Sequence, residues 1–313
     1  MKLILYLALC ILLFNCTNKY DKYKATPKYI TNAVASNKAY FEAYNESLKL
    51  WDVNFEELYI PTTYGVAHVI VSGKSNKESI VLLHGMNASS TMWYPNIKSL
   101  SDNYRVFAID FILEPGKSCI QKDIDDIETV IDWYNEIFYA LDLNNFNLIG
   151  ASRGGWLATN LTLNNPEKIK KLVLLSPAQT FTWIKPSSDL LKNIIYVFSS
   201  KEKRVNQTLE AMSNNPNNIS DTYIKQYKIG TGKDTLNKLM LKMKPFSRNE
   251  LKNLKLPTLV LIGDNDAINN EKTIELAKTL QKGQGEIITN AGHFLSIDQA
   301  DAINTKILEF LNN

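Results

Sequence analysis

The chain has 313 residues, of which 45% are hydrophobic and 21% charged, and its formal net charge is +3. This is enough apolar material for a large core, and the length suits one α/β domain with an insertion. The small net charge, without a basic stripe, an RNA-binding signature or zinc-finger spacing, argues against a nucleic-acid-binding protein.

The first 16 residues are typical of an export signal. Lys2 is followed by mostly apolar residues 3–14, a run shorter than the about 20 residues that a membrane-spanning helix needs. Cys16, which ends Leu12-Leu13-Phe14-Asn15-Cys16, resembles the lipidated cysteine of a bacterial lipobox, although Asn15 stands where a small residue is commoner. We expect an exported protein that is lipid-anchored in the cell envelope. Secretion after cleavage nearby and an uncleaved anchor are the alternatives.

Residues 17–28 are polar and rich in lysine, and behind a lipid anchor they would form a tether. Cys10 would leave with the signal (residues 1–16) and Cys16 would carry the lipid, so that Cys119 alone would remain as a thiol. No intramolecular disulfide is then expected in the mature chain. Its stability has to come from the core.

Residues 29–313 have the pattern of one α/β domain. An amphipathic segment at 30–51 and a hairpin at 55–72 precede alternating strand-like and helical stretches, as in a parallel sheet with crossover helices. The clearest helix spans 123–141 and has an apolar stripe. A last helix is expected from Ser296 to Leu311, opened by the capping box Ser296-Ile297-Asp298-Gln299. The strand-like runs are 80–83, 104–109, 146–149, 171–175, 258–262 and 286–289.

The sequence Gly150-Ala151-Ser152-Arg153-Gly154 has the pattern of a nucleophile elbow. A sharp turn from strand to helix lifts the serine hydroxyl clear of the sheet, and it leaves no room for side chains two residues before and after. The helix expected to follow would place its N–H groups beneath an oxyanion formed at Ser152. The pentapeptide by itself is equally compatible with an ordinary loop.

A serine hydroxyl becomes a good nucleophile only beside a base that a third group orients. Of the three histidines, His293 lies on a loop at the carboxyl end of the strand at 286–289, whereas His68 lies on an early strand at the sheet edge. We expect His68 to be a surface or half-buried residue. Asp264 and Asp266 follow the strand at 258–262, so the order Ser, Asp, His is that of the α/β-hydrolase triad.

Taken together, these segments resemble an α/β-hydrolase, in particular the bacterial carboxylesterases of that superfamily. Val81-Leu82-Leu83-His84-Gly85-Met86 is similar to the family's strand that ends in His-Gly, and the likeness covers roughly residues 40–313, most weakly at 180–250. The resemblance implies an α/β-hydrolase fold with a mostly parallel central sheet flanked by helices. It also implies an inserted helical cap at about 179–250, whose aromatic side chains would line the substrate pocket.

The resemblance assigns the catalytic roles as follows. Ser152 would be the nucleophile, His293 the base, and Asp266, three residues after the loop glycine, the acid that orients the base. Asp264 is the alternative acid, although its simpler role is to accept hydrogen bonds from backbone N–H groups in its loop. His84 would shape a turn. The elbow and turn glycines would be Gly150, Gly154 and Gly85.

The resemblance also implies that the backbone N–H groups of Met86 and Arg153 form the oxyanion hole. An arginine directly after the nucleophile departs from the neutral residue that is commoner in these enzymes. Its guanidinium would either point to solvent or pair with a local carboxylate. The alternative is that its charge favours substrates with an acidic group or supports the oxyanion.

We therefore expect a serine hydrolase of carboxylesterase type that forms an acyl-enzyme on a small or medium ester. The sequence contains no metal-ligand set such as His-Glu-x-x-His, and no cofactor is expected. The expected partners are the small-molecule ester and, through the anchor, a membrane. Thioesterase, lactonase, perhydrolase and C–C hydrolase chemistry use the same triad, and a non-catalytic or slow small-molecule receptor could use the same fold.

Overall fold

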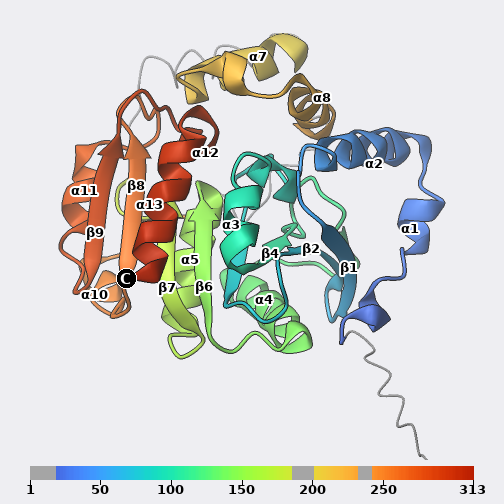
Figure 1. The fold of residues 1–313 in the computed structure, drawn as a ribbon, viewed down its shortest axis with the longest axis horizontal. Helices are drawn as coiled ribbons and strands as arrows, with labels where there is room; N and C mark the ends of the chain where they lie inside the picture. The colour runs from blue at the N-terminus through green and yellow to red at the C-terminus, as the bar shows by residue number, and fades with distance from the viewer. Residues whose placement is uncertain (1–18, 185–200, 232–241) are drawn as a thin grey trace, which may run out of the picture.

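The computed structural model describes residues 19–184, 201–231 and 242–313 (Figure 1). Within these residues the chain forms one nine-stranded sheet. Its strands are β1 (Phe55–Thr62), β2 (Gly65–Ser72), β3 (Ser79–Leu83), β4 (Arg105–Ile109), β5 (Cys119–Ile120), β6 (Phe146–Ala151), β7 (Ile169–Leu175), β8 (Thr258–Gly263) and β9 (Gly283–Ile288).

The strand order is β1-β2-β4-β3-β6-β7-β8-β9, with β5 paired to β2. The first hairpin is antiparallel and joins β4 in the antiparallel sense, whereas every pairing from β4 to β9 is parallel. The expected mostly parallel α/β sheet is thus confirmed. Because parallel strands end at the same edge, the loops that follow β3, β6, β8 and β9 meet above the sheet.

Helices cover both faces of the sheet, and each face has its own apolar core. Side chains of α4, α5 and α11 belong to one core, and those of α3 and α13 belong to the other. The helices described are α1 (Lys28–Thr31), α2 (Ala35–Leu48), α3 (Ile97–Asn103), α4 (Ile127–Leu141), α5 (Arg153–Asn164), α7 (Lys201–Met212), α8 (Asp221–Gly230), α10 (Arg248–Leu251), α11 (Glu271–Ala277), α12 (Leu295–Asp298) and α13 (Ala300–Asn312).

Between β7 and β8, helices α7 and α8 lie above the carboxyl edge of the sheet, and α2 lies beside α8 (Figure 1). Two side-chain hydrogen bonds join α2 to α8. Ser47 Oγ donates to the carbonyl oxygen of Thr222 at 3.3 Å, and Gln226 Nε2 donates to Tyr40 Oη at 3.3 Å. Parts of the cap expected at 179–250, namely 185–200 and 232–241, lie outside the described residues.

Two predicted helices differ from the structure, one in its start and one in its continuity and cap. Helix α4 begins at Ile127 rather than 123, because Asp126 is its N-cap and accepts a hydrogen bond from the N–H of Thr129 at 2.8 Å. The helix predicted from Ser296 is split into α12 and α13 at Gln299, whose φ is −132° and ψ is 49°. Ser296 lies inside α12 and caps nothing.

The signal segment and Cys16 lie outside the described residues. Of the residues 17–28 expected as a tether, those from 19 onward are described, and they pack against the domain rather than lead away from it. Tyr20 is buried, and its hydroxyl donates to the carbonyl oxygen of Leu141 at 3.1 Å. The Lys24 ammonium lies 2.8 Å from the Glu56 carboxylate. In the described ranges, no helix combines the length and apolar character needed to cross a membrane.

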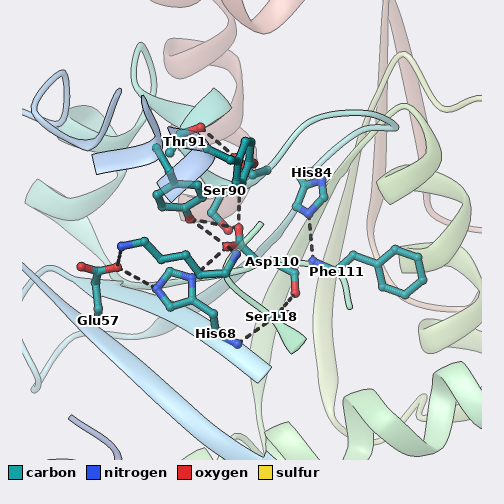
Figure 2. A network of polar contacts seen from close by, with 12 residues as sticks. Glu57, His68, His84, Ser90, Thr91, Asp110, Phe111 and Ser118 are labelled. Atoms are coloured by element: carbon teal, nitrogen blue, oxygen red, sulfur yellow. Dashed lines mark hydrogen bonds and ion pairs between the residues drawn. The ribbon is translucent and has the colours of Figure 1, made fainter. Parts of the chain in front are cut away.

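The prediction that His68 is a surface or half-buried residue was wrong. Its side chain is fully buried between two carboxylates (Figure 2). Nδ1 of His68 lies 2.8 Å from Asp110 Oδ2, and Nε2 lies 2.9 Å from Glu57 Oε2. Glu57 also pairs with the buried Lys117 ammonium. Strand β2 lies between β1 and β4 in the sheet, and the Tyr44 ring of α2 lies 5.8 Å from the His68 ring, so His68 is not at an edge.

Asp110 ties this cluster to neighbouring loops. It accepts hydrogen bonds from the N–H of Ser90 and of Lys117, both at 2.8 Å, and from the Tyr44 hydroxyl at 2.9 Å. Burial opposes ionisation of Asp110, but His68 and the donated hydrogen bonds outweigh it and hold the pKa of Asp110 well below its usual range. Burial likewise opposes ionisation of Glu57, yet His68 and Lys117 lower the pKa of Glu57 to about 2.

Burial would by itself lower the pKa of His68, but the hydrogen bonds and charges of Asp110 and Glu57 outweigh it and raise that pKa above 6.5. Each ring nitrogen of His68 faces a carboxylate oxygen, which favours the imidazolium form, in which both nitrogens donate. The contacts of protonated His68 with Asp110 and Glu57 contribute to the stability of the fold. Because the folded-state pKa of His68 is raised, this contribution is fully present below the unfolded-state pKa and is lost as the pH rises through the folded-state pKa.

We expect His68→Gln to lower the free energy of unfolding by about 3–5 kcal/mol near pH 6, because it leaves a buried carboxylate without its partner. The wild-type free energy of unfolding should decline as the pH rises through the folded-state pKa of His68, and the variant should lack this component. Urea unfolding at a series of pH values measures both effects. Equal pH dependence in the two proteins would contradict the assignment of a charged His68.

Candidate active site

Ser152 stands at the turn between β6 and α5, at the carboxyl edge of the sheet. Its φ is 52° and its ψ is −118°, a backbone conformation that costs strain for a residue with a side chain. Backbone hydrogen bonds hold the turn. Ser152 N–H donates to the carbonyl oxygen of Leu175 at 2.9 Å, and the Ser152 carbonyl accepts from Gly155 N–H at 2.9 Å.

The glycines of the pattern are explained by close approach. A Cβ on Gly150 would lie 2.3 Å from the carbonyl oxygen of Gly154, and one on Gly154 would lie 2.3 Å from that of Leu83. A Cβ on Gly85 would lie 3.3 Å from Ser152 Cβ. The absence of these side chains lets the loop after β3, the end of β6 and the start of α5 come together around the serine.

The structure brings Ser152, His293 and Asp266 together. Ser152 Oγ lies 2.8 Å from His293 Nε2, and His293 Nδ1 lies 2.9 Å from Asp266 Oδ1. The three side chains come from the loops after β6, β9 and β8, and the histidine and aspartate side chains are almost entirely buried. This is the arrangement in which an imidazole can take a proton from a hydroxyl while a carboxylate fixes its tautomer.

Asp266 is built to remain ionised. Its Oδ1 accepts the N–H groups of Ile268 at 2.8 Å and Asn269 at 3.1 Å, and its Oδ2 accepts from Asn269 Nδ2 at 3.0 Å. Burial opposes ionisation, but the charge of His293 and these hydrogen bonds outweigh it and hold the pKa of Asp266 well below its usual range.

Asp264, the alternative acid, faces elsewhere. Its two carboxylate oxygens accept the N–H groups of Asn290 and Ala291, each at 3.0 Å. Burial opposes its ionisation, but these backbone hydrogen bonds lower the pKa of Asp264. Asp264 therefore fastens the loop that carries His293 and does not contact the imidazole.

His84 orients the peptide that follows it. Phe111 N–H donates to His84 Nε2 at 2.9 Å (Figure 2). The imidazole proton is therefore on Nδ1, which lies 2.8 Å from the carbonyl oxygen of Gly85. Burial lowers the pKa of His84, which favours this neutral form. Because the C=O of Gly85 and the N–H of Met86 belong to one planar peptide and point opposite ways, His84 fixes the direction of that N–H.

The two expected oxyanion donors flank the nucleophile. Met86 follows Gly85 and lines the same cavity as Ser152, and Arg153 is the first residue of α5. Among the residues that the structure describes, neither the Met86 N–H nor the Arg153 N–H has a hydrogen-bond acceptor. The side chain of Arg153 is buried and pairs with the Glu114 carboxylate, with its guanidinium carbon 4.9 Å from the centre of the Phe111 ring. It does not point to solvent.

A small apolar cavity opens beside the serine and histidine. Two tyrosines of α8, Tyr223 and Tyr227, form the wall that faces the loop after β3. Gln226, between them, donates to Ser89 Oγ at 2.9 Å and accepts from Thr91 Oγ1 at 2.9 Å, so α8 is fastened to that loop. The cavity is lined by Gly85, Met86, Ala88, Met92, Ala151, Ser152, Tyr223, Tyr227, His293, Phe294, Leu295, Ser296 and Ile297.

Two carboxylates near the site were missed by the sequence analysis. Asp298 was assigned to a capping box, but it accepts the N–H groups of Gly292 and Asn214, each at 2.8 Å, and the Ser213 hydroxyl. It thereby anchors the loop of His293 to the end of α7. Glu114 lies in a loop whose sequence has no motif, and its partners are evident only from the fold.

Comparisons with known proteins agree with this geometry. A family model for the alpha/beta hydrolase fold matches residues 78–220. The uncharacterized carboxylesterase nap of Bacillus subtilis (strain 168) is 34% identical over 281 residues, which cover 87% of this chain and 92% of that protein. Carboxylesterase YbfK of the same organism is 30% identical over 292 residues, covering 89% of this chain and 95% of that protein.

A solved structure gives the same result. The crystal structure of naproxen esterase (carboxylesterase NP) from Bacillus subtilis matches with a TM-score of 0.83 and 32% identity, and the match covers 89% of this chain and 99% of that one. Likeness at this identity over nearly the full length of the relatives shows common family as well as common fold. The chain therefore belongs to the α/β-hydrolase family, as a carboxylesterase-like member.

Proposed function

We propose that this protein hydrolyses carboxylic esters through an acyl-enzyme formed on Ser152. The observation that carries the proposal is the unbroken hydrogen-bonded chain from Ser152 Oγ through His293 to Asp266, at distances of 2.8 and 2.9 Å, with the serine on a strained turn. The relatives named carboxylesterases support the same chemistry.

In the proposed mechanism, Ser152 Oγ attacks the ester carbonyl carbon while His293 Nε2 takes the hydroxyl proton. The tetrahedral oxyanion accepts hydrogen bonds from the N–H groups of Met86 and Arg153. His293 then gives its proton to the leaving alcohol oxygen as the C–O bond breaks. Water attacks the acyl-enzyme with His293 again as base, which releases the acid and restores Ser152. Asp266 holds the imidazole tautomer throughout.

The cavity supports a substrate with a small or medium apolar group next to the ester. Met92, Tyr223, Tyr227 and Leu295 leave little room, and none of these four side chains carries a charge. The triad does not distinguish oxygen esters from thioesters, so the choice of oxygen esters follows the relatives.

We expect the protein to hydrolyse p-nitrophenyl esters in a series from acetate to palmitate, with a preference for short and medium acyl chains. Ser152→Ala should abolish turnover because it removes the nucleophile. Asp266→Asn should lower kcat about 10⁴-fold, because the amide favours the wrong imidazole tautomer. Initial rates of p-nitrophenolate release measure both effects.

Asp264→Asn is the matched control for the acid. It changes the neighbouring carboxylate, which holds backbone N–H groups rather than His293, and activity should stay within about tenfold of wild type. If Asp264→Asn were the more damaging substitution, the assignment of Asp266 would be wrong. If folded wild type hydrolysed no ester of the series, the proposed function would fail.

We expect Tyr223→Ala to shift acyl preference toward longer chains, because it removes a wall of the cavity. The ratio of kcat/KM for octanoate to that for acetate should rise by about 10–200-fold, the range for a changed hydrophobic pocket. Tyr139→Ala is the control, since Tyr139 on α4 is 88% exposed. An equal shift in both variants, or none in Tyr223→Ala, would exclude α8 as the wall that limits chain length.

We further propose that the chain is exported and lipid-anchored through Cys16. Support comes from the sequence alone, namely a charged start, the apolar run at 3–14 and a cysteine at a lipobox-like position. In a bacterial host, wild type should incorporate labelled fatty acid and partition into the membrane fraction, whereas Cys16→Ser should do neither. Labelling of both proteins alike would disprove the anchor at Cys16.

A further inference from the structure

The carboxylate of Glu114 contacts both backbone segments that carry the proposed oxyanion donors. Its Oε2 accepts the N–H of Asn87 at 2.7 Å, and Asn87 directly follows Met86. Its Oε1 pairs with Nη1 of Arg153, whose backbone N–H is the second donor. One side chain thus joins the loop after β3 to the first residue of α5.

This bridge is rigid because both of its members are buried. The exposed fraction of the side chain is 5% for Glu114 and 1% for Arg153. The guanidinium also lies over the Phe111 ring, which stacks on Tyr134 with ring centres 6.0 Å apart and planes 6° apart. An ion pair screened from water is far stronger than the same pair at the surface.

The backbone at Asn87 is held in an unfavourable conformation. Its φ is 58°, in the left-handed region that residues other than glycine adopt at a cost. His84 fixes the peptide between Gly85 and Met86 through the Gly85 carbonyl. Glu114 fixes the next peptide, between Met86 and Asn87, through its N–H. The two contacts together determine the position of Met86 from both sides.

We propose that Glu114 is a positioning residue that holds the oxyanion hole in its working geometry, and that the charge of Arg153 serves this bridge. This inference rests on the proposed function. A carboxylate beside a developing oxyanion would repel it, and the paired guanidinium removes that repulsion. Glu114 can then accept the Asn87 N–H without an electrostatic penalty in the transition state.

The test compares Glu114→Leu and Glu114→Gln in the full chain, with p-nitrophenyl acetate as substrate. Glu114→Leu removes the acceptor for Asn87, and kcat should fall about 10–100-fold, because displaced donors act mainly in the transition state. KM should change less than about threefold. Glu114→Gln keeps an acceptor oxygen, and kcat should recover to within about tenfold of wild type.

A second measurement separates positioning from loss of fold. The Ser152 hydroxyl oxygen adds to the carbonyl of an aryl trifluoromethyl ketone and forms a tetrahedral oxyanion. The inhibition constant of this ketone should therefore rise in Glu114→Leu by the same factor by which kcat/KM falls. If Glu114→Leu does not fold, Glu114→Asp is measured instead. It keeps the charge beside Arg153 but is one methylene too short to contact Asn87 as well. The inhibition constant should rise in this variant by the same factor by which kcat/KM falls.

Glu78→Gln is the matched control. Glu78 accepts hydrogen bonds from Asn147 Nδ2 at 3.1 Å and from the Lys170 ammonium at 2.8 Å, and its strand end lies away from the catalytic loops. Its kcat and inhibition constant should equal those of wild type. A folded Glu114→Leu with wild-type kcat would overturn the inference while leaving the proposed function intact. An inactive wild type would remove the proposed function itself.

Discussion

The left-handed backbone of Ser152 is the constraint on which the rest of the site depends. A residue held at φ 52° is stable only where its surroundings leave no alternative, and here β3, β6 and α5 converge on it. The same crowding that excludes side chains at Gly150 and Gly154 brings the loop after β3 against the nucleophile. One steric constraint therefore places the Ser152 hydroxyl beside both the neighbouring backbone N–H groups and the His293 imidazole.

Around this turn, buried carboxylates hold the loops in place by accepting backbone N–H groups. Asp110 holds the loop that begins at Ser90, Glu114 holds Asn87, Asp266 holds its own loop and Asp298 holds Gly292. A buried carboxylate is costly unless its charge is matched. His68 matches Asp110 and Arg153 matches Glu114, so the cations near the site are explained by the acceptors that they neutralise.

The sequence analysis located the strands, the elbow and the three side chains that the structure brings together, because each depends on local pattern, such as the glycines beside Ser152 or the strand before Asp266. It failed where the answer depends on a distant segment. The alternation around His68 gives no sign that the Tyr44 ring of α2 packs against it. Asp298 fits a capping box in the sequence, although its partners Ser213, Asn214 and Gly292 lie in loops outside that helix. Glu114 and Arg153 meet only because the loops after β4 and β6 meet.

The contact between α2 and α8 determines where the folded unit starts. Gln226 links Tyr40 of α2 to the loop after β3, so a helix that precedes every strand helps to hold the cavity wall. A chain that began at β1 would lack this contact, and it would also lack the α2 side chains Tyr40, Tyr44 and Leu48 that are buried in one core of the sheet. Helix α2 is therefore part of the support behind the cavity wall, although it contributes none of the side chains Ser152, His293 and Asp266.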